Sequence, residues 1–191
     1  MINEQVLREI DSVIKLVWEK DIKKDHRKNY LLREDTLKAS IYFHLRRRLK
    51  KLLKENSLRI YTEFYLSKIK LRPDIVIAEI DEKSEEWHLK DWVVSIPVII
   101  EIKFESGKSK GTKDVIKRDI EKMKTYIKDV SPDSKCYLAV LYEDDCAKLT
   151  WMNKCATNNW ANGKVTELNA GYLDGKLVFE ANPCIKVELN Q

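Results

Sequence analysis

The chain has 191 residues, of which 43% are hydrophobic and 35% are charged, and this suits one globular domain with a sizeable core. Only five glycines and four prolines are present, so the composition excludes a fibrous or disordered chain. The formal net charge of +5 permits a polyanionic partner without requiring one.

The cysteines and the apolar stretches indicate the compartment. The four cysteines form no CxxC pair and have no histidine at ligand spacing, so no zinc site is expected. The N-terminal segment carries acids throughout and lacks the apolar core of a signal peptide. The longest apolar stretch, 92–100, is too short to span a bilayer. We therefore expect a cytoplasmic protein with reduced thiols and no membrane partner; a disulfide is the alternative for the cysteines.

Hydrophobic periodicity predicts two helices at the start of the chain. Apolar residues recur at helical spacing over 2–20 and again over 32–54, with a polar connector at 21–28. The pattern then changes to the β-branched and aromatic residues that are typical of strands. Strands are expected at 58–66, 72–80 and 92–104, with a charged hairpin loop at 81–91. The third strand is almost continuously apolar, which favours a central place in the sheet.

The second half of the chain completes an α/β pattern. A loop at 105–111 precedes a helix at 112–129 and a buried strand at 135–142. A short helix around 150–160 and Gly-punctuated strands are expected after that. The predicted order is α-α-β-β-β-α-β-α-β, a single α/β domain with a central mixed β-sheet flanked by helices. Its parts are an N-terminal helix and connector (2–28), a core (32–142) and a C-terminal extension (143–191).

Two charged side chains stand at the end of the long apolar strand. Glu101 and Lys103 are two residues apart, so strand periodicity places them on one face. Five acid-x-Lys pairs occur in the chain, but only this one ends a run of buried-strand residues, where charges are costly without partners. Asp74 begins the preceding strand, which a hairpin folds back beside Glu101. Two carboxylates and an ammonium are therefore expected to meet at one edge of the sheet.

Another carboxylate stands where an apolar residue is expected. Glu34 falls on a helical wheel in the middle of an apolar stripe, so it is expected to face the sheet or the edge of its core. That stripe contains Leu37, Ile41, Leu45 and Leu52. The alternative is that Glu34 lies in the first turn and only compensates the helix dipole.

The order of these residues along the chain resembles the PD-(D/E)XK nuclease superfamily, the restriction-endonuclease-like fold. The matching pattern is a helix with Glu34, a strand with Pro73-Asp74, a strand with Glu101-Ile102-Lys103, and then a basic helix. The resemblance covers about residues 32–142. It implies that Asp74 and Glu101 bind a metal ion, that Lys103 is the catalytic lysine, and that Glu34 assists from the first core helix.

The implied chemistry fits these residue types. Phosphodiester hydrolysis needs a hard cation that neutralises charge on the phosphate and lowers the pKa of the attacking water. Mg²⁺ prefers oxygen ligands, so Asp74, Glu101 and the backbone carbonyl of Ile102 would suffice, with Mn²⁺ as a substitute. Lys103 would orient the water or stabilise the pentavalent phosphate. Glu63 is a further candidate for the cluster, and a structural ion pair of Lys103 with either metal-binding carboxylate is the alternative.

Basic residues gather on two segments. The later segment adjoins the expected site, so phosphate contact is favoured there; it contains Lys108, Lys110, Lys113, Lys117 and Arg118. The earlier segment lies at the end of the second helix, where a solvated face that compensates the helix dipole is favoured over phosphate contact. It contains Arg46, Arg47, Arg48, Lys50, Lys51 and Lys54.

These patterns together predict a Mg²⁺-dependent endonuclease that hydrolyses phosphodiester bonds. DNA is favoured as the substrate, although neither basic segment distinguishes DNA from RNA. Cleavage of two strands usually needs two sites, which is consistent with a homodimer, but no residue indicates one. The alternatives are a non-catalytic nucleic-acid-binding or protein-interaction module, and a subunit active only within a larger nuclease or defence assembly.

Overall fold

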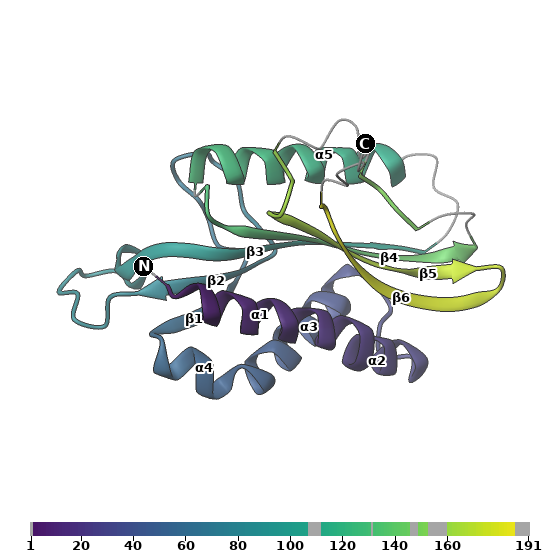
Figure 1. Cartoon of the computed structure of the whole chain (residues 1–191), viewed down its shortest axis with the longest axis horizontal. Helices are drawn as coiled ribbons and strands as arrows, with labels where there is room; N and C mark the ends of the chain where they lie inside the picture. The colour runs from purple at the N-terminus through teal and green to yellow at the C-terminus, as the bar shows by residue number, and fades with distance from the viewer. Residues whose placement is uncertain (1, 107–111, 131, 146–148, 153–159, 186–191) are drawn as a thin grey trace, which may run out of the picture.

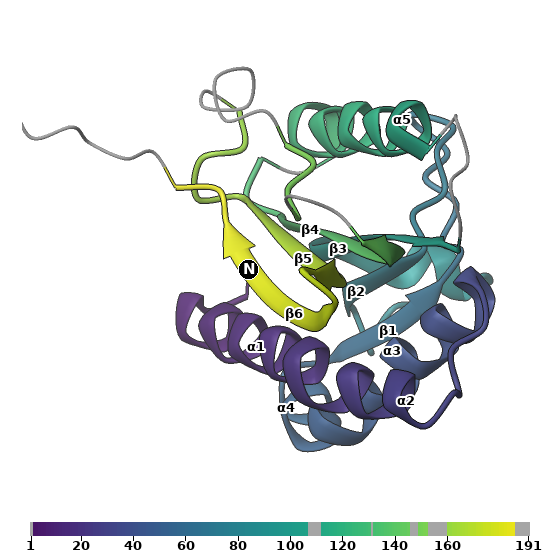
Figure 2. The same ribbon diagram turned by 90° about the vertical axis from the view of Figure 1, so that its right-hand side faces the viewer.

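The computed structural model describes residues 2–106, 112–130, 132–145, 149–152 and 160–185. They form one six-stranded mixed sheet with helices on both faces (Figure 1), which confirms the predicted α/β class and its central mixed sheet. Figure 2 shows the layers from a second direction. Helix α5 (Thr112–Thr125) covers one face of the sheet, and the N-terminal helices cover the other.

Five helical segments form the N-terminal layer. They are α1 (Glu4–Leu16), a π-helical turn (Val17–Ile22), α2 (Lys23–Arg27), α3 (Glu34–Arg48) and α4 (Lys50–Glu55). The second predicted helix therefore begins at Glu34 and is interrupted at Leu49, whose φ of −88° and ψ of 2° leave helical geometry. Among the described helices, none is both long and apolar enough to cross a membrane.

The first three segments run on without a break, so the predicted connector at 21–28 is wrong and helix continues to Arg27. Tertiary contacts explain this continuation through a polar sequence. Ile22 is fully buried, and Arg48 of α3 donates two hydrogen bonds to Asp21, at 2.5 and 3.0 Å. A buried charge that is paired in this way no longer favours a loop.

The strands lie in the sheet in chain order, β1-β2-β3-β4-β5-β6. β2 is antiparallel to β1 and β3, β3 to β5 are parallel, and β6 is antiparallel to β5. A parallel pair needs a crossover, which between β3 and β4 is α5 followed by a π-helical turn, Tyr126–Val130. The strand bounds are β1 Leu58–Thr62, β2 Ile75–Ile80, β3 Val93–Glu105, β4 Lys135–Asp145, β5 Val165–Leu173 and β6 Lys176–Pro183.

The first two strands are shorter than predicted, and this matters at the site. β1 ends at Thr62, because Glu63 adopts a φ of 54°, which lies in the left-handed region and is incompatible with a regular strand. β2 starts at Ile75, so Asp74 precedes this strand instead of opening it. The connection from β2 to β3 contains a short 3₁₀ helix, Leu89–Trp92, at the end of the predicted hairpin loop.

β3 is buried on both faces, as its apolar sequence predicts. It pairs with β2 on one side and with β4 on the other. Ile100 and Ile102 belong to the core under the N-terminal helices, whereas Ile99 belongs to the core under α5. Because strand residues alternate between faces, Glu101 shares the α5 face with Ile99.

The C-terminal part contains two strands, β5 and β6, where the predicted order gives one. Their hairpin turns at Asp174 and Gly175, which have φ values of 49° and 69°. Two residues with positive φ suit the tight turn whose twist matches the flanking strands. The described residues 150–152 and 160 are not helical, and the rest of the predicted helix around 150–160 falls at 153–159, outside the described residues.

Candidate active site

Asp74 and Glu101 meet where β2 begins. Ile75 pairs with Ile100 in the antiparallel register, so the residue before Ile75 lies opposite Glu101. Asp74 Oδ2 accepts a hydrogen bond from the backbone N–H of Ile102 at 2.8 Å. The hairpin thus brings together the two carboxylates that the sequence predicts at one edge of the sheet.

Glu101 is a buried carboxyl, with 2% of its surface exposed. Tyr126 donates a hydrogen bond from its hydroxyl to Oε1 at 2.6 Å, and the Lys122 ammonium lies 3.7 Å from Oε2. Burial raises the pKa of Glu101 from 4.5 to about 8. The Tyr126 hydrogen bond and the Lys122 charge oppose this rise, while the negative charges of Asp74 and Asp119 add to it.

Lys103 bridges α3 and α5. Its Nζ lies 2.9 Å from Glu34 Oε2 and 3.7 Å from Asp119 Oδ2. Burial lowers its pKa, but the hydrogen bond to Glu34 and the charge of Asp119 outweigh that effect, and the pKa is raised. Among the described residues these two are the salt-bridge partners of Lys103, so the predicted alternative of an ion pair with Asp74 or Glu101 is wrong.

Glu34 reaches this cluster from the first residue of α3. It lies in the first turn, as its alternative interpretation holds, yet its carboxylate turns toward the sheet and pairs with Lys103. The first-turn position and the orientation toward the sheet therefore occur together, and dipole compensation is not the only role of Glu34. A carboxylate at a helix N-terminus is also favoured by the helix dipole.

Lys38 is a site residue that sequence reasoning missed. Its Nζ lies 2.7 Å from Asp74 Oδ1 and also donates to Glu63 Oε1. Burial opposes its charge, but the hydrogen bonds to Asp74 and Glu63 raise its pKa. Glu63 in turn donates its backbone N–H to the Asp74 carbonyl at 3.0 Å, so it joins the cluster as a further acid. Lys38 follows Glu34 by one helical turn, and that spacing was the available signal.

Helix α5 and the π-helical turn after it supply three more polar side chains, which sequence reasoning also missed: Asp119 and Lys122 from α5, and Tyr126 from the turn. Lys122 lies 2.7 Å from Asp119 Oδ1, and both approach Glu101. Asp119 is 3% exposed, and its Oδ2 makes no hydrogen bond with the described residues. Like Glu34, it interrupts an apolar helical stripe, and this could have revealed it.

The oxygen atoms here suit a hard cation. Asp74 and Glu101 offer carboxylates, and a strand residue directs its N–H and C=O to the same side, so the Ile102 carbonyl faces the side where Asp74 lies. Within the described ranges, no group of three or more His, Cys, Asp or Glu side chains is placed to hold a metal ion. Mg²⁺ is commonly held by one or two carboxylates while it keeps several waters, so these donors fit it.

The predicted nucleic-acid-binding residues are placed only in part. Lys108 and Lys110 lie outside the described residues, and Lys113 lies in α5 without a described side chain. Lys117 and Arg118 are exposed on α5. With Lys122 they line an open pocket of about 460 Å³. Glu121 also lines this pocket, so its charge is mixed, with three cations and one acid.

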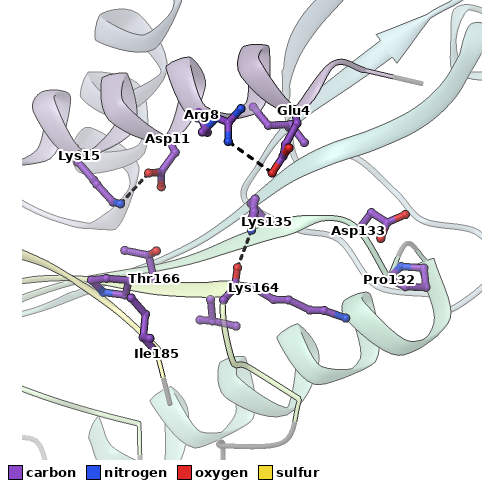
Figure 3. Close-up of a pocket in the computed structure, with 14 residues that line it drawn as sticks. Glu4, Arg8, Asp11, Lys15, Pro132, Asp133, Lys135, Lys164, Thr166 and Ile185 are labelled. Carbon is purple, nitrogen blue, oxygen red and sulfur yellow. Dashed lines mark hydrogen bonds and ion pairs between the residues drawn. The ribbon is translucent and has the colours of Figure 1, made fainter. Parts of the chain in front are cut away.

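A separate pocket of about 490 Å³ lies between α1 and the first residues of β4 and β5 (Figure 3). Its charges are mixed, with Arg8, Lys15 and Lys135 among the bases and Glu4 and Asp11 among the acids. Lys15 and Asp11, one turn apart on α1, pair at 2.6 Å along its wall. None of the predicted site residues lines this pocket, so it is distinct from the candidate active site.

Comparison with known proteins gives no family assignment. No protein-family model, no curated protein and no solved structure matches this chain.

Proposed function

We propose that this protein is a metal-dependent phosphodiesterase, an endonuclease that hydrolyses DNA with a Mg²⁺-activated water. The observation that carries the proposal is the meeting of Asp74 and the buried Glu101, with the Lys103 ammonium held nearby by Glu34 and Asp119 and within reach of the charge of Asp74. A buried carboxyl next to a second carboxylate is costly, and groups perturbed in this way gather at functional sites. Asp119 adds a buried oxygen without a hydrogen bond from the described residues, which suits a site that holds water or a cation.

The topology supports the restriction-endonuclease-like fold as part of this proposal. Helix α3, the antiparallel strands β1 to β3, the crossover helix α5 and the parallel strand β4 follow one another along the chain. The resemblance to PD-(D/E)XK nucleases rests on the same order of elements. Its motif residues fall at the start of β2 and near the end of β3.

The roles of the side chains follow from their contacts. Asp74, Glu101 and the Ile102 carbonyl would hold the ion, which supplies charge neutralisation at the phosphate and a more acidic water. Lys103 remains an ammonium because Glu34 pairs with it, so it acts as a donor to the reacting phosphate or water and not as a general base. Glu34 orients that ammonium. Mn²⁺ is expected to replace Mg²⁺.

Incubation of the purified chain with supercoiled plasmid, single-stranded DNA and RNA tests the proposal. Cleavage of DNA is expected with Mg²⁺ or Mn²⁺ and should disappear in the presence of EDTA. Lys103→Ala should lose cleavage while it keeps the circular dichroism spectrum of the wild type. Lys83→Ala is the matched control, because Lys83 belongs to an exposed acid-x-Lys pair in the β2–β3 connection. Unchanged cleavage by Asp74→Asn would refute the proposal.

One observation favours the alternative of a non-catalytic module. Lys38 already pairs with Asp74 and Glu63, so part of the negative charge of the cluster is compensated without a metal ion. That alternative, or a subunit active only in an assembly, predicts an inert chain. Calorimetry with Mn²⁺ separates the two: a site lost in Asp74→Asn supports the nuclease, and no divalent-cation binding supports the module.

A further inference from the structure

A basic pocket of about 410 Å³ lies between α3, α4 and the edge strand β1. Four cationic side chains and two tyrosines line it, and none of the described lining residues is acidic. The six residues are Arg46, Lys50, Lys54, Arg59, Tyr42 and Tyr61. The apolar parts of Leu53, Leu58 and Ile60 complete its wall.

Most of these cations form no salt bridge with a described acidic residue. In the described part of the chain, no carboxylate forms a salt bridge with Arg46, Lys50 or Lys54, whereas Arg59 pairs with Glu82 at 2.7 Å. The sequence favoured a solvated, dipole-compensating face for this segment. A solvated face of this kind needs no pocket. Like charges that converge around a pocket repel each other unless an anion binds between them.

The tyrosines add a second kind of contact. The Arg46 guanidinium lies 5.6 Å from the centre of the Tyr42 ring, and its Nη1 donates to the Tyr42 hydroxyl at 3.0 Å. Tyr61 packs on Phe64 with ring centres 5.8 Å apart. Both tyrosines are thus held in place while they line the pocket. Cations that contact phosphates, combined with aromatic rings that stack on bases, are how proteins bind single strands.

The pocket and the candidate active site share two elements. Lys38 and Tyr42 are one turn apart on α3, and Tyr61 lies two residues before Glu63 at the end of β1. Lys38 and Glu63 form a salt bridge at the candidate active site. Arg46 is one further turn along α3, about 12 Å from Lys38 at about 1.5 Å per residue. A nucleic-acid strand seated in the pocket therefore lies a few phosphates from Asp74 and Glu101, the two carboxylates of the candidate active site.

We propose that this pocket binds a single-stranded segment of nucleic acid, with its phosphates on Arg46, Lys50 and Lys54 and a base against Tyr42. The segment belongs to the strand that enters the candidate active site, and in this respect alone the inference rests on the proposed function. Binding itself needs neither the metal ion nor cleavage.

Fluorescence anisotropy in EDTA with a labelled single-stranded oligodeoxynucleotide of about ten nucleotides tests the pocket. Arg46→Ala/Lys50→Ala should weaken binding about tenfold and make the slope of log K against log salt shallower by about 1.4, since each lost phosphate contact accounts for about 0.7. Lys20→Ala/Lys24→Ala is the matched control: these lysines are exposed, one turn apart, and outside the pocket. The control should stay within about twofold of the wild type.

The stacking contact has its own pair of variants. Tyr42→Leu should weaken binding by about fivefold or more, whereas Tyr42→Phe, which keeps the ring, should stay close to the wild type. Equal losses in the pocket and control double variants would overturn the proposal. Tighter binding of the duplex form of the probe would also overturn it. So would polyglutamate that displaces the probe as effectively as unlabelled oligonucleotide does, since the site would then recognise charge alone.

The same proteins separate this inference from the proposed function. If the wild type binds the probe through the pocket but cleaves nothing with Mg²⁺ or Mn²⁺, the pocket stands and the proposed function fails. If Arg46→Ala/Lys50→Ala binds the probe like the wild type while DNA is still cleaved, the pocket fails and the proposed function stands.

Discussion

Replacement of Glu101 by Gln is expected to stabilise the metal-free protein at neutral and alkaline pH. Glu101 is almost fully buried, and burial raises its pKa from 4.5 to about 8. Glutamine keeps the shape of the side chain and can still accept the Tyr126 hydrogen bond, but it carries no charge. The substitution therefore removes the group that penalises folding as it ionises.

The direction and size of the effect follow from proton linkage. Between pH 4.5 and about 8 the folded state holds a proton on Glu101 that the unfolded chain has released, so stability falls as pH rises through this window. At about 1.4 kcal/mol for each pKa unit, the full cost approaches about 5 kcal/mol above pH 8, and about 3 kcal/mol of it is present at pH 7. Glu101→Gln has no such cost.

Urea denaturation in EDTA, followed by circular dichroism from pH 4 to 9, measures this difference. We expect the stability of Glu101→Gln minus that of the wild type to grow by about 3 kcal/mol between pH 4 and pH 7. The other titrating groups contribute to both proteins and cancel in the difference. Parallel stability curves for the two proteins over this range would refute the reasoning, because they would mean that Glu101 ionises in the folded state as easily as in water.

Three further substitutions test other contacts. Lys38→Met removes the ammonium that occupies Asp74, so Mn²⁺ should bind several-fold more tightly by titration calorimetry; weaker binding would contradict a competing role for this lysine. Tyr126→Phe should cost about 1–2 kcal/mol in urea denaturation, and more at pH 9 than at pH 5, because the lost hydrogen bond favours the ionised carboxyl. Arg48→Met should cost about 2–3 kcal/mol at pH 7. Because Arg48 lowers the pKa of Asp21, that loss should shrink as pH falls below 3.8; a pH-independent loss would point to packing instead.

The elements followed from the sequence wherever one periodicity dominated. β3 was predicted from its continuous apolar run, and its position between β2 and β4 is the one in which both faces are covered. Helix α5 was predicted from its inner apolar stripe. The predictions failed where tertiary contacts overrode local composition, as at 21–28, where the pairing of Asp21 with Arg48 holds a polar sequence in a helix.

In the candidate site, too, local signals predicted some residues and tertiary contacts brought in the others. Strand periodicity and the cost of burying charge were sufficient to single out Asp74, Glu101 and Lys103, because these signals are local. Tyr126 had no such signal, and the only one for Lys38 was its spacing of one helical turn from Glu34. A lysine on a charged helix and a tyrosine near a helix end are ordinary until the fold brings them to Asp74 and Glu101.

The composition of the chain permits a polyanionic partner but does not locate its binding site, since a net charge of +5 says nothing about where cations gather. The sequence by itself determined the α/β class, the long buried strand and the carboxylates that stand among apolar residues. Only the tertiary structure decided which charges pair. Lys103 pairs with Glu34 and Lys38 pairs with Asp74, whereas Arg46 and Lys50 line a pocket without a described acidic partner. Pairing depends on distances of a few ångströms between segments far apart in the chain, and no local pattern encodes them.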